Sequence, residues 1–471
     1  MDSHFVNTVL ITYNVKRISF QRLGTHNVII KQGFKYKLKT NEQVEATCRL
    51  FAGHRRRVYN YFVEINKHRL FNGHKILRYD EMEFWLSKIL MKSEEFAWLS
   101  QAPKAILQQA LRDLDKAYKD AFDKTQPLKR LPTRKKRTFS STFRNPQIRS
   151  KRKDGRYSYN LKVDNRRVFL PKIGWVGFYK SHEIIGDIKN ITVSKTAGDW
   201  FVSIQTERQV EDPVHPSTTA VGCDRGVTVP FAFSDGTKTK AIKATKQLEN
   251  KLAALQRKAA KQVKFSKNWQ KTQEKIRKVH HKIACIRKDY LHKLSSRISN
   301  NHAMVYLEAL SIDNMTKRAK PKLSEDGLSY ERNGAAAKSG LNKAILDVGW
   351  GMFAEFLKYK QAWRGGYTAT VPAPHTSQTC LVCGHKSKDN RHTQARFCCA
   401  ECGFQGNADF VASVNVETRG QAGIFAQLSH DTSSELLAFS RGLVCGSVLL
   451  VQHRDQKTVG NREALPPYDR L

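Results

Sequence analysis

Four cysteines in the C-terminal part of the sequence form two Cys-x-x-Cys pairs, and a glycine directly follows each pair. The pairs are Cys380–Cys383 and Cys399–Cys402. Pairs separated by about 15 residues supply four thiolates in the tetrahedral arrangement that Zn²⁺ prefers. Four protein ligands leave no open coordination position, so the spacing predicts a structural zinc. Cys398 precedes the second pair, but Cys399 keeps the spacing to Cys402 and is the expected ligand. The alternative is a set of reduced structural thiols.

Three acidic residues stand in unusual contexts. Asp224 lies in the apolar run AVGCDRGV, Glu308 lies in MVYLEALSI, and Asp409 begins a predicted helix after the cysteines. A carboxylate within an apolar strand is costly unless it is paired or binds a metal. Taken singly, each could be a buried ion pair or a helix cap. Together, such carboxylates can hold two Mg²⁺ ions, which activate a water and stabilise the leaving oxygen of a phosphodiester.

The charge of the chain indicates a polyanionic partner. Its 471 residues include 82 Lys and Arg against 42 Asp and Glu, a net charge of +40. This excess favours nucleic acid over a membrane surface, since no amphipathic anchor accompanies it. The most basic stretch is 129–156, and its phenylalanines Phe139 and Phe143 favour nucleic-acid contact over a merely solvated charge run. The candidate contacts are Arg55, Arg56, Arg57, Arg134, Lys135, Lys136, Arg137, Lys151 and Arg152.

Hydrophobic periodicity predicts the first half of the chain to be strands enclosing helices. Alternation predicts one or two strands from residue 28 to 40 and more over 157–208, with a hairpin turn at Gly198-Asp199. These strands could close one β-barrel, with residues 41–150 as a helical insertion. The insertion is expected to hold a helix capped by Asn41, then helices over 80–96 and 103–124, with the basic stretch as a loop.

The second half has an α/β pattern after a polar linker at 211–217. Strands are expected around Asp224 and Glu308, with two long basic helices over 246–300 between them. A loop over 316–340, either a lid or a simple connector, precedes one helix over 341–363 and a strand. A last helix follows the cysteines, and the tail from about residue 418 is expected to be irregular. Neither a signal peptide nor an apolar run of roughly 20 residues is evident, which predicts a protein of the compartment that holds DNA; in a prokaryote it would be cytoplasmic and nucleoid-associated.

Three blocks of sequence resemble TnpB, the transposon-encoded RNA-guided nuclease family, and the compact type V CRISPR effectors derived from it. The blocks are GCDRGVTVPFAFSDG, VYLEALSIDNM and TSQTCLVCGHKSKDNRHTQARFCCAECGFQGNAD. The resemblance implies a multidomain α+β fold: an N-terminal β-barrel wedge with an inserted helical recognition lobe, then an RNase H-like (RuvC) α/β nuclease domain with an inserted four-cysteine zinc ribbon. The implied ranges are 1–40 for the extension and first wedge strands, 41–156 for the recognition lobe and basic arm, 157–210 for the wedge, 218–379 and 405–420 for the nuclease domain, 380–404 for the ribbon and 421–471 for the tail.

The resemblance also implies a function and a set of cofactors. Asp224, Glu308 and Asp409 would be the catalytic ligands of two Mg²⁺ ions, and Cys380, Cys383, Cys399 and Cys402 would hold one Zn²⁺. The partners would be a guide RNA and a double-stranded DNA target with a short flanking motif, without a membrane and with a monomer favoured. Two alternatives from other classes are a guided DNA-binding repressor without cleavage and an unguided transposase or resolvase.

Two segments depart from the pattern of many relatives, at three positions. Arg225 follows the first acid where an apolar residue is common, which is typical of one branch of the family. After Asp409, Val411 stands in place of an asparagine and Ser413 in place of the second of two alanines. These changes question the packing of the last helix or an auxiliary polar contact.

Overall fold

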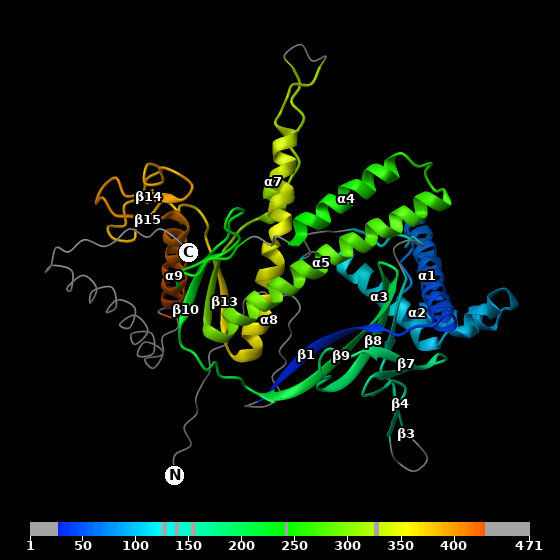
Figure 1. Ribbon diagram of the computed structural model, residues 1–471. Helices are drawn as coiled ribbons and strands as arrows, with labels where there is room; N and C mark the ends of the chain where they lie inside the picture. Colours follow the sequence, from blue (N-terminus) through cyan, green and yellow to red (C-terminus); the bar gives the residue numbers. More distant parts are fainter. Residues whose placement is uncertain are drawn as a thin grey trace, which may run out of the picture. The chain divides into compact units, whose positions relative to one another are not determined.

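The computed structural model describes residues 27–123, 125, 130–136, 141–151, 157–240, 244–324 and 329–428 (Figure 1). Contacts divide the chain into two compact units. Unit 1 comprises Met1–Asp212 with Lys246–Cys285, and unit 2 comprises Pro213–Thr245 with Ile286–Leu471. The predicted N-terminal extension, most of the predicted tail, and Arg137, Phe139 and Arg152 lie outside the described residues.

Unit 1 contains a seven-stranded antiparallel sheet in the order β2-β8-β9-β1-β7-β6-β5. Its first strand pairs with β9 from Asn27↔Glu211 to Lys37↔Phe201, so the predicted joining of the N-terminal strand to the later strands is confirmed. The hairpin between β8 and β9 is also confirmed, with Gly198 at φ +100° in its turn. The strands are β1 Asn27–Leu38, β2 Thr142–Pro146, β5 Lys162–Asp164, β6 Arg167–Leu170, β7 Gly174–Tyr179, β8 Asp187–Thr196 and β9 Asp199–Glu211.

Three helices of unit 1 pack into one apolar core with this sheet. They are α1 (Glu42–Phe71), α2 (Tyr79–Phe84) and α3 (Lys104–Phe122). Asn41 caps α1 as predicted, because its side-chain oxygen accepts the Val44 N–H at 2.8 Å. The single helix predicted over 80–96 is wrong: a π-helical turn (Trp85–Ile89) and 3₁₀ turns (Leu90–Lys92 and Glu94–Gln101) follow α2, separated at an extended Ser93.

The basic stretch contains regular structure where a loop was predicted. Strand β2 pairs with β8, and a second hairpin joins β3 (Arg149–Lys151) to β4 (Tyr157–Tyr159). Phe143 is only 1% exposed and packs edge-on against Phe51, with ring centroids 5.6 Å apart. The prediction that Phe143 contacts nucleic acid is therefore wrong, because the alternation of β2 turns its ring into the core.

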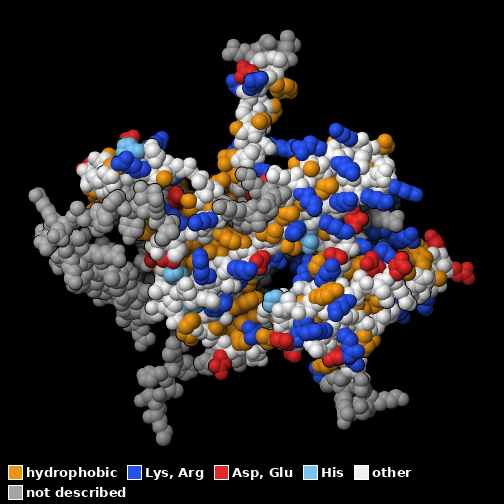
Figure 2. Space-filling model, viewed as in Figure 1, with side chains coloured by type: hydrophobic (Ala, Val, Ile, Leu, Met, Phe, Trp, Pro, Cys, Tyr) orange, Lys and Arg blue, Asp and Glu red, His pale blue; other side chains and the backbone are white. Residues whose placement is uncertain are grey.

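The two long basic helices are confirmed as α4 (Ala244–Ala260) and α5 (Lys267–Asn301). Ile276, Val279 and Ile283 are buried at helical spacing on α5. In the view of Figure 2, Lys and Arg side chains gather over these helices. Because the apolar residues of α5 are buried, its Lys and Arg side chains remain on the surface, where their charge can attract a polyanion.

Unit 2 is built on a four-stranded sheet in the order β11-β10-β12-β13. Strands β10, β12 and β13 are parallel and β11 is antiparallel to β10. α8 packs on one face through an apolar cluster that includes Phe231 and Phe353, and α9 packs on β10 (Figure 1). The elements are β10 Ala220–Asp224, β11 Ala232–Phe233, β12 Met304–Glu308, β13 Tyr367–Val371, α6 Ile312–Met315, α7 Ala335–Val348, α8 Trp350–Arg364 and α9 Ala408–Leu428.

Three predictions for unit 2 are corrected by this structure. The helix expected over 341–363 is two helices, because Gly349 adopts φ +79° and interrupts the hydrogen-bonding pattern between α7 and α8. The loop expected over 316–340 ends early, since α7 begins at Ala335. The tail expected from residue 418 is still helical, and α9 continues to Leu428. Among the described residues, no helix is both long and apolar enough to cross a bilayer.

Candidate active site and cysteine cluster

Strand register brings two of the predicted acids to the same edge of the unit 2 sheet. The parallel pairing of β10 and β12 runs from Ala220↔Met304 to Cys223↔Leu307. The next residues are Asp224 and Glu308, which end these neighbouring strands at their carboxyl ends. Asp409 lies in the first turn of α9, the helix that packs on β10. Two adjacent strands and one helix therefore carry the three carboxylates to one region.

A close approach of backbones fixes α9 on β10. A Cβ at Gly222 would lie 2.1 Å from the Ser413 carbonyl oxygen and 2.6 Å from the Glu417 amide nitrogen. Any side chain at this position would push the helix away from the strand. Gly222 thus sets the separation between the strand that ends at Asp224 and the helix that begins beside Asp409.

Burial raises the pKa values of both strand acids, and neighbouring carboxylates add to the rise for Asp224. Burial is the main cause of the raised pKa of Glu308, which is 6% exposed. Burial, followed by the charges of Glu308 and Asp409, raises the pKa of Asp224 to about 7. The three carboxylates are therefore close enough to interact electrostatically, and their fully ionised state calls for a cation.

A loop between the sheet and the cysteines holds the Glu308 side chain. The buried Thr376 hydroxyl donates to Glu308 Oε1 at 2.7 Å. Asn415 on α9 donates through its side-chain amide to the carbonyls of Thr376 and Thr379, each at 2.8 Å. Arg419, one turn later, donates to the carbonyls of Pro372 and Pro374. Hydrogen bonds from α9 thus fix the position of this loop, and Thr376 on the loop orients the Glu308 carboxylate.

The two sequence departures have structural roles. Arg225 is buried, and its guanidinium donates to the backbone carbonyl of Glu308. Its positive charge offsets part of the rise that burial causes in the pKa of that acid. Val411 is fully buried and packs with Phe397 in the small core beside the cysteines. Ser413 is also buried and donates to the Phe410 carbonyl. Asn415, which sequence reasoning missed, gives this helix a polar contact of its own through its bonds to the carbonyls of Thr376 and Thr379.

A second residue that sequence reasoning missed is Arg391. It lies between the two cysteine pairs, and its positive charge offsets part of the rise that burial causes in the pKa values of Asp224 and Glu308. Its guanidinium also donates to the Gln394 carbonyl at 2.9 Å. A single arginine among the many cations of this chain carries no sequence signal, so only the fold could identify it.

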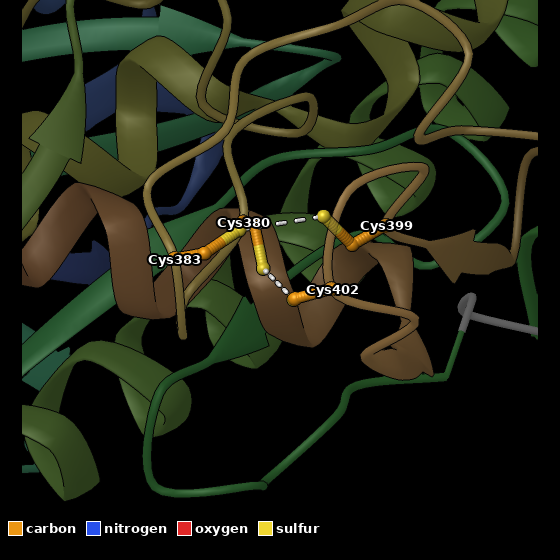
Figure 3. A group of neighbouring side chains, drawn as sticks. All are labelled: Cys380, Cys383, Cys399 and Cys402. Atoms are coloured by element: carbon orange, nitrogen blue, oxygen red, sulfur yellow. Dashed lines mark hydrogen bonds between the residues drawn. The ribbon is translucent and has the colours of Figure 1, made fainter.

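The four cysteines converge on one point (Figure 3). Their sulfur atoms all lie within 4.8 Å of one another, with 3.6 Å between Cys380 and Cys402 and 3.5 Å between Cys383 and Cys399. Gly384 and Gly403 follow the pairs at φ +73° and +71°, a conformation that favours glycine. The second pair begins directly after the hairpin strand β14 (Arg396–Cys398), which pairs with β15 (Gln405–Asn407). Cys398 itself is not part of the cluster.

The predicted nucleic-acid contacts in unit 1 have different surroundings. Arg55 is 7% exposed and its guanidinium binds Asp113 at 2.6 Å, so it stabilises the interior, unlike the surface role predicted for it. Arg57 lies over the Trp98 ring and Lys135 over the Tyr59 ring. The other described candidates are half-buried or exposed: Arg56, Arg134, Lys136 and Lys151. Arg134 also forms an ion pair with Glu64, with 3.6 Å between its Nε and the carboxylate oxygen.

The pKa of Asp224 predicts a pH-dependent stability of the metal-free protein. The unfolded chain releases this proton near pH 3.8, whereas the folded protein keeps it until about pH 7. The free energy of unfolding should therefore fall between about pH 4 and 7, by up to about 4 kcal/mol from this group. Asp224→Asn should remove this loss and be more stable than wild type at pH 8.

Denaturant unfolding at pH 5 and pH 8 measures this difference, in buffer without Mg²⁺ and without a chelator that would extract zinc. Comparing wild type with Asp224→Asn cancels the other titrating groups, such as His292, whose pKa burial lowers to about 4. Added Mg²⁺ should stabilise wild type at pH 8 more than the variant. Equal pH dependence in the two proteins would contradict the assigned electrostatics.

Comparisons with known proteins agree along most of the chain. Residues 203–319 match a family model described as a probable transposase (OrfB_IS605), residues 350–416 match a Cas12f1-like TNB domain, and residues 30–75 match a helix-turn-helix domain. In this structure, residues 30–75 contain most of strand β1 and the single continuous helix α1. The putative RNA-guided DNA endonuclease InsQ of Escherichia coli K12 is 42% identical over 391 residues, covering 83% of this chain and 92% of InsQ.

Two further similarities are more distant. A putative RNA-guided DNA endonuclease of Streptomyces pristinaespiralis is 29% identical over 408 residues, covering 83% of this chain and 90% of that protein. Among solved structures, the protein in a Cas12f1–sgRNA–target DNA complex superposes with a TM-score of 0.49 at 13% identity, covering 83% of this chain and 99% of that one. The extent and level of identity to InsQ, together with the matching family model, establish that the chain belongs to the TnpB (OrfB_IS605) family.

Proposed function

We propose that this protein is an RNA-guided DNA endonuclease. It binds a guide RNA, recognises a short motif beside the target, and cuts both strands of the DNA by hydrolysis of phosphodiesters at one carboxylate site. The observation that carries the proposal is the convergence of Asp224, Glu308 and Asp409 in a chain 42% identical to a protein named as a putative RNA-guided DNA endonuclease. A repressor that only bound DNA would have no use for three mutually repelling carboxylates.

We also propose that unit 2 contains an RNase H-like, RuvC-type nuclease domain. Its three parallel strands with one antiparallel edge strand, and acids at the ends of the first two parallel strands, support this assignment. The antiparallel sheet of unit 1 with its inserted helices supports the wedge and recognition lobe in the ranges inferred from sequence. The Cys-x-x-Cys pairs and their sulfur separations support a structural zinc ribbon over residues 380–404.

The donor set at the three acids fits Mg²⁺. Carboxylate oxygens are the ligands that this ion prefers, and the charges of Glu308 and Asp409 add to the burial that raises the pKa of Asp224, which indicates a surplus of negative charge. Asp224, Glu308 and Asp409 would hold the metal ions. When bound, two such ions supply an activated water and stabilise the leaving oxygen of the phosphodiester.

The chain's own residues prepare this site. Thr376 holds the Glu308 carboxylate in one orientation through its 2.7 Å hydrogen bond. Arg225, buried behind the carboxylates, offsets part of their repulsion and ties the end of β12 to the end of β10. Arg391 brings a positive charge from the ribbon, where it can attract the phosphate of the DNA strand. Preorganised charge of this kind is typically the largest contribution to phosphoryl-transfer catalysis.

Thr376 is thus a positioning residue, and its removal should weaken cleavage without loss of target binding. Thr376→Val keeps the shape but cannot donate to Glu308, so the single-turnover rate should fall on the order of 10- to 100-fold. The Mg²⁺ concentration for half-maximal rate should rise, because one carboxylate is less well held. Thr376→Ser should restore most of both quantities. A Val variant with an unchanged Mg²⁺ requirement and rate would rule out the positioning role.

Nucleic acid retained during purification distinguishes guided from unguided action. The protein, expressed with its neighbouring DNA, should elute with a high ratio of absorbance at 260 nm to that at 280 nm. Sequencing of the retained RNA should give one species with a constant scaffold. An RNA-free protein that still cuts DNA would favour the transposase or resolvase alternative.

A further inference from the structure

A basic pocket lies at the edge of the unit 2 sheet, separate from the three acids. It has a volume of about 330 Å³ and is lined by Lys238, Thr239, Lys240, Tyr290, Lys293, Leu294 and Arg297. We call it the edge pocket. Its two walls are the segment that follows β11 and the part of α5 that belongs to unit 2.

The edge pocket carries four cationic side chains and no carboxylate in its lining. Lys293 forms an ion pair with Asp289, one helical turn earlier, at 2.7 Å. In the part of the chain that the structure describes, Lys238, Lys240 and Arg297 form no ion pair within 4 Å. Unbalanced positive charge in a small concave site attracts an anion, and phosphate groups suit Lys and Arg donors.

Packing and hydrogen bonds hold both walls in place. Leu291, Leu294 and Ile298 of α5 are buried against the sheet, which leaves Lys293 and Arg297, four residues apart, on one exposed face of the helix. Thr239 is buried, and its hydroxyl oxygen accepts the Phe231 N–H at 2.9 Å. The Tyr290 hydroxyl donates to the Lys240 carbonyl at 3.4 Å and joins the two walls. The pocket is therefore a built feature rather than a chance gathering of lysines.

Strand pairing relates the edge pocket to the carboxylates. Asp224 pairs with Ala232 of β11, and Ala232 forms a bridge with Lys238. The α5 wall of the edge pocket packs with Cys223 on one face of the sheet, and the pocket reaches around the sheet edge toward the other face. Residues paired directly across strands point to the same face, so Asp224 and Lys238 share that other face. Two interstrand spacings place their Cα atoms roughly 10 Å apart. A strand whose scissile phosphate reaches Asp224 would pass the edge pocket within a few nucleotides.

We propose that the edge pocket binds the phosphate backbone of the DNA strand being cut and holds that strand in register with the carboxylates. This inference rests on the proposed nuclease function and adds a specific backbone contact to it. The pocket recognises the phosphate groups by their charge, so it should bind DNA of any base sequence equally well. The guide RNA is the competing occupant, but nothing requires it to approach Asp224, whereas the cleaved strand must.

The test replaces the three unpaired cations together, as Lys238→Ala/Lys240→Ala/Arg297→Ala. A matched control removes the same charge from α7 and α8, as Lys338→Ala/Lys343→Ala/Lys358→Ala, none of which lines the pocket. With guide-loaded protein and a matched duplex, the pocket variant should cut on the order of tenfold more slowly than the control at moderate salt. Guide RNA affinity should be the same in both. Arg297→Lys, which keeps the charge, should cut nearly like wild type.

A second readout needs no cleavage. Binding of a fluorescent single-stranded oligodeoxynucleotide by guide-free protein is measured against salt concentration. The slope of log affinity against log salt should be shallower in the pocket variant than in the control by about 2, at about 0.7 for each lost phosphate contact. Equal slopes and equal cleavage rates in the two variants would overturn the inference, as would a selective loss of guide RNA affinity. By contrast, if wild type and control fail to cut at all, the proposed nuclease function is what fails, and the slopes still decide the pocket.

Discussion

Asp224→Ala is expected to abolish cleavage of both DNA strands while guide and target binding stay nearly unchanged. The carboxylate ends β10 beside Glu308, where burial and two neighbouring acids raise its pKa to about 7. Removing it relieves repulsion in the metal-free protein, so the fold should survive. The chemistry depends on holding metal ions at fixed positions, and losing one ligand should lower the single-turnover rate at least about 1,000-fold.

The same logic predicts how the other two acids behave. Glu308→Ala and Asp409→Ala should each reach a similar residual rate, and a double variant should be little slower than either, because the ligands act as a unit. Asp313→Ala, an acid in the nearby short helix α6, is a matched control that should cut normally. Near wild-type cutting by Asp224→Ala would exclude the assigned site. Loss of target binding instead would make Asp224 a structural residue.

Cys380→Ser and Cys402→Ser are expected to lose zinc and to destabilise unit 2. The four sulfurs lie within 4.8 Å of one another, and metal bound at such a site contributes folding free energy directly. Zinc content should fall from about one ion per chain to near zero, and the free energy of unfolding by several kcal/mol. Cleavage should fall too, because the ribbon positions Arg391 and adjoins the loop that carries Thr376.

Cys398→Ser provides the control for zinc. Cys398 is adjacent in sequence to Cys399 but stands outside the cluster, at the end of strand β14. Atomic absorption on the three variants should therefore show full zinc only for Cys398→Ser. Retention of zinc by both Cys380→Ser and Cys402→Ser would refute the ribbon assignment, and its loss from Cys398→Ser would mean that the ligand was misassigned.

The sequence was sufficient to predict those features that depend on interactions between residues close together in the chain. Asn41 caps α1 because a short polar side chain before a helical pattern is a local signal. The cysteine cluster follows from spacing alone, and the acids stood out because carboxylates in apolar strands need compensation. The joining of β1 to the later strands could be expected as well, since all of them alternate, but its two actual partners, β9 and β7, could not.

The sequence was insufficient where distant contacts decide the structure. Phe143 lies within a basic stretch, yet its ring is buried because β2 adds to the edge of a sheet built mostly from residues farther along the chain. Gly349 breaks the helical pattern at φ +79°, and a Cβ added there would also lie 3.0 Å from Cδ1 of Leu291, a distant contact that the local sequence does not encode. Thr376 and Asn415 matter only because α9 packs beside the loop after β13, a contact that no local pattern encodes.

Guided cleavage of a matched DNA duplex tests the central claim most directly. The protein would be purified with its retained RNA, and single-turnover cutting measured with Mg²⁺ on a target complementary to that RNA and on one with mismatches next to the flanking motif. The account predicts that the matched duplex is cut on both strands, that the mismatched duplex is not, and that Asp224→Ala binds the matched duplex without cutting it. Cutting that ignores the match, or that survives removal of the RNA, would contradict it.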